Sequence, residues 1–98
     1  MHYALNVVQK LIRLSRTEAE YLRQASFLPS YLAEIVKSGV YASDESVSLT
    51  VSRDVAEAFS SAFTDRLAKA GFGADYELTD EGRLLENLVD RFYVSDGA

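Results

Sequence analysis

The sequence predicts an α+β fold in which about four helices pack on a small sheet of two or three strands. Three observations support this. Residues 47–51 alternate apolar and polar side chains, as a half-buried strand does. Residues 53–70 carry an apolar stripe at helical spacing. A short sequence signature, in which an apolar run leads into a helix, occurs twice in the chain. An all-α fold is the alternative, because the apolar pairs in residues 3–14 also recur at a helical spacing.

The repeated signature lies at residues 11–25 and 48–62, which read LIRLSRTEAEYLRQA and SLTVSRDVAEAFSSA. Each copy places a serine where its side chain can accept from the free backbone N–H groups at a helix start. In the first copy Ser15 and Glu18 also form a capping-box pattern, in which the glutamate reaches back to the backbone N–H of the serine. The signature predicts two strand-to-helix junctions. Duplication and convergence on the same capping chemistry both account for it.

The strand at residues 47–51 needs a partner, because a single strand cannot satisfy its own backbone groups. Residues 10–14 and 75–78 have suitable side chains. This requirement favours an extended segment before Ser15, while a helix over residues 3–14 stays open. Residues 39–46 are predicted to form a loop.

Helices are predicted over residues 16–26, 30–37, 53–70 and 80–93. Pro29 suits the first turn of the second helix. Gly71 is expected to end the third helix in the left-handed conformation, and Thr79 to cap the fourth. The expected core includes six large apolar side chains of the last two helices: Phe59, Phe63, Leu67, Leu85, Leu88 and Phe92.

Length and composition indicate one compact domain over residues 1–98, with a disordered tail at residues 95–98. The chain has no cysteine, which excludes disulfides and thiolate metal sites and favours the cytoplasm. No segment approaches the roughly 20 apolar residues of a membrane span.

Charge is concentrated at one end of the chain. Residues 71–98 contain seven acidic and two basic side chains, so their net charge of −5 equals that of the whole protein. A protein of this sign repels phosphate backbones, which makes nucleic acid an unfavourable partner. The acidic segment instead favours another protein, of basic character, as the partner.

Catalytic and cofactor sites are not apparent in the sequence. His2, the only histidine, lies beside the initiator methionine, so no serine or threonine has an evident general base. The spacing of Asp75, Glu77, Asp80 and Glu81 does not match a calcium loop. We therefore expect no enzymatic activity, no metal and no cofactor.

The matched arginines, Arg16 and Arg53, each begin a predicted helix. A helix N-terminus with an arginine could bind an anion. The simpler interpretation is that they form ion pairs one turn along the helix with Glu20 and Glu57.

Residues 76–85, YELTDEGRLL, resemble the Tyr-x-Leu-Thr-x-x-Gly-x-x-Leu segment of winged-helix transcription regulators. In that family the segment joins the wing to the last helix. The resemblance implies that residues 76–78 end a wing strand, that Thr79 caps the last helix, and that this helix takes part in dimerisation.

Three classes of function follow. The first is a small acidic protein-interaction domain, such as an adaptor, an antitoxin or an immunity-type inhibitor, whose partner is a basic protein or a second copy of the chain. The second is a degenerate winged-helix regulator, and the third is a small-ligand binder or enzyme. For the first class the expected partner-binding residues are Asp75, Glu77, Asp80, Glu81, Glu86, Asp90 and Tyr93.

Overall fold

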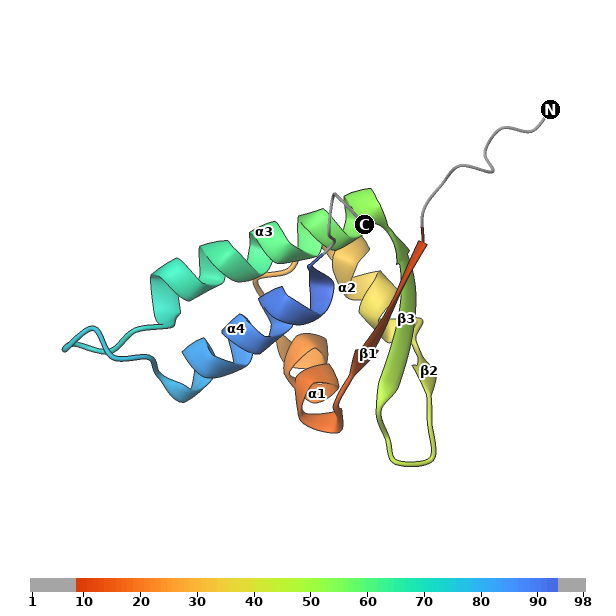
Figure 1. Cartoon of the computed structure of the whole chain (residues 1–98), viewed down its shortest axis with the longest axis horizontal. Helices are drawn as coiled ribbons and strands as arrows, with labels where there is room; N and C mark the ends of the chain where they lie inside the picture. The colour runs from red at the N-terminus through yellow and green to blue at the C-terminus, as the bar shows by residue number, and fades with distance from the viewer. Residues whose placement is uncertain (1–8, 94–98) are drawn as a thin grey trace.

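The computed structural model describes residues 9–93, which form four α-helices and a three-stranded antiparallel sheet (Figure 1). The predicted α+β class is confirmed, and the all-α alternative is wrong. The tail predicted at residues 95–98, and the part of residues 3–14 that precedes Gln9, lie outside the described residues. The elements in chain order are β1 (Gln9–Leu14), α1 (Arg16–Gln24), α2 (Ser30–Lys37), β2 (Val40–Tyr41), β3 (Val47–Ser52), α3 (Arg53–Ala70) and α4 (Asp80–Phe92).

The sheet has the strand order β1-β3-β2. β1 pairs with β3 over its whole length, from Gln9 opposite Ser52 to Leu14 opposite Val47, so the extended segment before Ser15 is confirmed. β2 lies on the other side of β3 and was not predicted, because two residues are too few to show an alternating pattern. Residues 75–78 do not join this sheet, and Leu78 forms only an isolated bridge with Phe72.

The two copies of the repeated signature pair with each other. Ile12 and Leu49 occupy equivalent positions in the two copies, and they are direct partners in the β1–β3 ladder. An approximate two-fold axis through this pair therefore relates the two strands. Both serine caps form as predicted. Ser15 Oγ accepts from the backbone N–H of Glu18 at 3.1 Å, and Ser52 Oγ accepts from that of Val55 at 3.2 Å.

The fourth helix also begins as predicted, because Thr79 Oγ1 accepts from the backbone N–H of Gly82 at 2.9 Å. The conformation predicted for Gly71 is wrong. This residue ends α3 with φ −84°, in the right-handed region. Glycine is required there because a larger residue would not fit. A Cβ at position 71 would lie 2.6 Å from the carbonyl oxygen of Leu67, closer than van der Waals contact allows.

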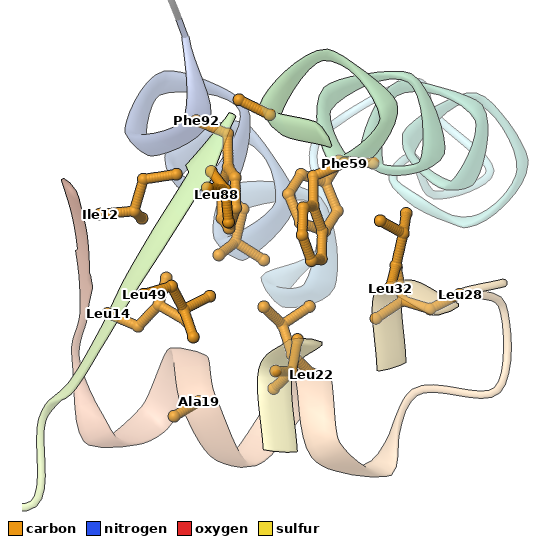
Figure 2. Packing of buried hydrophobic residues seen from close by; sticks show 14 of the residues in the cluster. Ile12, Leu14, Ala19, Leu22, Leu28, Leu32, Leu49, Phe59, Leu88 and Phe92 are labelled. Atoms are coloured by element: carbon orange, nitrogen blue, oxygen red, sulfur yellow. The ribbon is translucent and has the colours of Figure 1, made fainter. Parts of the chain in front are cut away.

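The core lies between the apolar face of the sheet and the helices (Figure 2). Phe59 and Phe92 point into it from α3 and α4, and their ring centroids are 4.6 Å apart. Of the six predicted core residues, the five that are fully buried are Phe59, Phe63, Leu85, Leu88 and Phe92. Leu67 is only partly buried and packs at the edge of the core.

Helices α3 and α4 run side by side, and their connection lies at the end of the molecule far from the sheet (Figure 1). We call residues 53–92 the α3–α4 hairpin. An ion pair fixes it to α1, because Arg91 Nε lies 3.0 Å from Oε1 of Glu18. The same Glu18 oxygen accepts from the backbone N–H of Ser15 at 2.8 Å, which completes the predicted capping box. The buried Glu18 thus links the start of α1 to the end of α4.

Candidate functional site

The predicted partner-binding residues lie on the α3–α4 hairpin and just beyond its end, but they do not form one surface. Asp75 and Glu77 belong to the connection between the helices, and Asp80 and Glu81 lie in the first turn of α4. Glu86 and Asp90 lie further along α4. Tyr93 follows the helix and is 64% exposed.

Glu86 and Asp90 border a groove between α3 and α4. The groove has a volume of about 400 Å³, and its remaining lining residues are Thr64, Leu67 and Val89. The two carboxylates are exposed and one helical turn apart, while Leu67 and Val89 are partly buried. Within residues 9–93 neither carboxylate has a cationic side chain within 4.0 Å. We call these five residues the acidic groove.

Glu81 has a different role, because it faces α1 and α3. The Tyr21 hydroxyl donates to Glu81 Oε2 at 2.5 Å, and Arg66 Nε donates to the same oxygen at 2.9 Å. The hydrogen bond from Arg66, followed by that from Tyr21, holds the pKa of Glu81 below its ordinary value. Burial and the nearby carboxylate raise the pKa of Tyr21 above its usual range, so the phenol stays protonated. Glu81 therefore joins three helices from within the fold.

The Glu81 contacts predict a pH-dependent stability. Since the pKa of Glu81 is lower in the folded state than in the unfolded chain, its contribution is present above the ordinary value of 4.5 and is lost as the pH falls through the folded value. We expect urea unfolding at a series of pH values between 7 and 3 to show a smaller loss of stability for Glu81→Gln than for the wild type. The exposed Glu34→Gln variant is the control and should follow the wild type. Parallel curves for wild type and Glu81→Gln would contradict this role.

Asp80 and Asp75 interact locally. Asp80 pairs with Arg83 at 3.3 Å, and Asp75 Oδ1 accepts from the backbone N–H of Glu77 at 3.2 Å. Tyr76 lies between Asp75 and Glu77, is 87% exposed, and has a positive φ of 66°. The connection between α3 and α4 thus exposes an aromatic side chain whose neighbours in the sequence are both acidic.

The acidic groove includes residues that the sequence did not indicate. Leu67 was predicted in the core, and Thr64 was not distinguished from other polar positions of its helix. The spacing of apolar residues shows that a helix has a buried side. It does not show which residues at the edge of that side the neighbouring helix leaves in contact with solvent. Leu67 lies at that margin, so it contributes both to the core and to the groove.

The two matched arginines form the predicted ion pairs. Arg16 Nε lies 3.3 Å from Glu20 and also 2.9 Å from Glu45, and Arg53 Nε lies 3.6 Å from Glu57. These contacts favour the ion-pair interpretation over an anion site at each helix start.

Among the described residues there is no group of three or more His, Cys, Asp and Glu side chains that could hold a metal ion. None of the helices in the same part of the chain is long and apolar enough to cross a membrane. Comparisons of the chain with protein-family models, with curated proteins and with solved structures found no match.

Proposed function

We propose that this protein is a small protein-interaction domain whose partner is a basic protein that binds at the acidic groove. The observation that carries the proposal is the combination of two partly buried apolar side chains with two carboxylates that have no cationic partner among residues 9–93. Apolar contact supplies affinity at such a surface, and complementary charge accelerates encounter with the partner.

The charge of the groove favours a different chain over a second copy of the same chain. A two-fold symmetric interface places the same patch of both subunits against itself. Glu86 and Asp90 would then approach the same two carboxylates of the other copy, and like charges brought together in an interface oppose binding. A basic partner removes this repulsion and neutralises both side chains.

The proposal is tested by reversing the two charges. In the variant Glu86→Lys/Asp90→Lys we expect the association rate with a basic partner isolated from the native cell to fall by about tenfold or more at low salt. Surface plasmon resonance at several salt concentrations measures this rate. The control variant Glu34→Lys/Asp54→Lys has the same net charge but alters α2 and the start of α3, away from the acidic groove.

If both variants slow association equally, overall charge rather than the acidic groove governs binding, and the proposal fails. An unchanged rate in Glu86→Lys/Asp90→Lys also overturns it. Circular dichroism spectra of the variants establish that each remains folded, so a loss of binding can be assigned to the surface.

A winged-helix regulator is the second candidate, and the order of elements favours it. Helices α1 and α2 are joined by residues 25–29, and the antiparallel hairpin of β2 and β3 follows them. In the winged-helix family a recognition helix precedes the wing. In this chain the counterpart of a wing would be residues 42–46, rather than the turn before Thr79 that the resemblance of residues 76–85 implies.

The surface that such a regulator would present to DNA carries little positive charge. The exposed positions of α2 include Glu34 and Lys37, and residues 42–46 include Asp44 and Glu45. Since phosphate contacts supply most of the affinity in non-specific DNA binding, we expect no retardation of a random DNA duplex in a gel-shift assay at low salt. A retarded band that disappears as salt is added would favour the winged-helix candidate.

A further inference from the structure

We infer that the occupant of the acidic groove is an amphipathic helix of the partner, with lysine or arginine side chains beside its apolar face. This inference rests on the proposed function and specifies the partner's form. The groove runs between two helices and is open to solvent, and its volume of about 400 Å³ admits only a few side chains. It therefore accommodates a row of side chains from a single element of the partner.

The lining residues identify the chemistry of that element. Leu67 on α3 and Val89 on α4 provide the apolar contacts, and Thr64 provides a hydroxyl. The carboxylates of Glu86 and Asp90 both belong to α4, so the negative charge lies along one wall of the groove. A complementary segment has apolar side chains toward the floor and cationic side chains along one flank.

A helix satisfies these requirements better than an extended segment does. The backbone groups in the interiors of α3 and α4 are already used within each helix, so the groove offers no ladder of free N–H and C=O groups. An extended peptide would place unpaired backbone groups against Leu67 and Val89, which is costly. A helix pairs its own backbone and presents residues one turn apart, which is also the spacing of Glu86 and Asp90.

The charges on α4 also favour helix binding. Glu86 and Asp90 are like charges at positions i and i+4 of α4, and their repulsion weakens the helix. Lysine or arginine side chains of a bound helix would relieve this repulsion. A helix with acidic flanks would increase it, so the groove discriminates between amphipathic helices by their charge.

The test uses three synthetic peptides of about 18 residues, long enough for five helical turns. The first has leucine on one face and lysine beside it, and the second has glutamate in place of each lysine. The third has the composition of the first, redistributed so that no apolar face remains. Fluorescence anisotropy measures affinity, and NMR of the methyl groups of Leu67 and Val89 locates the bound peptide.

We expect the lysine helix to bind and to shift the methyl resonances of Leu67 and Val89, and the other two peptides to bind at least about tenfold more weakly. Its affinity should fall by about tenfold in Glu86→Gln/Asp90→Asn and by less than about twofold in the matched control Glu34→Gln/Asp54→Asn.

Equal binding of the first and third peptides, with the same dependence on Glu86 and Asp90, would contradict a helical occupant of the groove. That result would still agree with a basic partner. Methyl shifts confined to other parts of the molecule would overturn the inference as well. If no peptide binds, the helix inference fails, and the association kinetics of the native basic partner decide whether the proposed function fails with it.

Discussion

Replacing Phe59 with alanine is expected to lower the free energy of unfolding by about 3–5 kcal/mol. The Phe59 side chain is fully buried, and its ring lies 4.6 Å from that of Phe92 and 5.9 Å from that of Phe63. Truncation removes the transfer free energy of the ring and leaves a cavity between α3 and α4 that the surrounding side chains fill only in part.

The expected loss is a large part of the total stability of a domain of this size, about 5–15 kcal/mol. Chemical denaturation followed by circular dichroism measures it. Phe72→Ala is the matched control, because Phe72 is 48% exposed and its loss should cost less than about 1 kcal/mol. Equal effects of the two substitutions would contradict the burial of Phe59 in the core.

Replacing Gly82 with alanine is expected to destabilise the protein by about 1–3 kcal/mol, although alanine stabilises most helices. A Cβ at Gly82 would lie 2.2 Å from the carbonyl oxygen of Gly71 and 2.9 Å from its carbonyl carbon. Both neighbours are backbone atoms, and the Gly71 oxygen also accepts from the backbone N–H of Thr79 at 2.8 Å. The first turn of α4 would have to move away from the end of α3.

Gly73→Ala provides the control for this substitution. The nearest atom to a Cβ there is Asp75 Oδ1 at 3.6 Å, and Gly73 does not have a positive φ. Alanine should therefore be neutral at that position or stabilise the fold by about 0.4–1 kcal/mol through the unfolded state. If Gly82→Ala raises the melting temperature, the close approach of α3 and α4 at this point is wrong.

The two substitutions bear on the proposed function as well as on stability. Phe59 and Gly82 hold α3 and α4 at the separation that forms the acidic groove, but neither residue lines it. Loss of binding in these variants would accompany loss of structure. Loss of binding in Glu86→Gln/Asp90→Asn should leave the fold intact, so the two kinds of variant distinguish the scaffold from the surface.

The predictions that proved right depend on short-range rules. Ser15, Ser52 and Thr79 cap helices because a side-chain oxygen can reach a backbone N–H three residues along the chain. Residues 53–70 form a helix of the predicted extent because their apolar stripe is long and regular. The strand at residues 47–52 extends the predicted one by a single residue.

The predictions that failed concern contacts between elements. Gly71 was assigned a left-handed conformation because glycine often ends helices in that way. In the structure its φ is −84°, and glycine is needed because a Cβ there would clash with the carbonyl oxygen of Leu67; the Gly71 peptide also packs closely against Gly82 on the next helix. Leu67, predicted to lie in the core, is instead only partly buried at its edge.

Contacts between elements also explain why the candidate site could not be predicted in full from the acidic segment. The sequence places six carboxylates between residues 75 and 90, but it does not show which of them share a face. Glu81 pairs with Arg66 and Tyr21, whereas Glu86 and Asp90 border the groove. Which carboxylates remain available to a partner depends on the packing of three helices.

The amino-acid sequence was sufficient to predict the fold class, the capped starts of three helices, the large core side chains of α3 and α4 and the acidic character of the C-terminal region. These features follow from side-chain spacing, local hydrogen bonding and composition, all of which act within a few residues. Only the folded structure reveals the pairing of the two repeat copies, the position of β2, the close contact of Gly71 with Gly82 and the separation of Glu81 from the acidic groove. Each of these depends on groups far apart in the chain, and only packing of the elements brings them together.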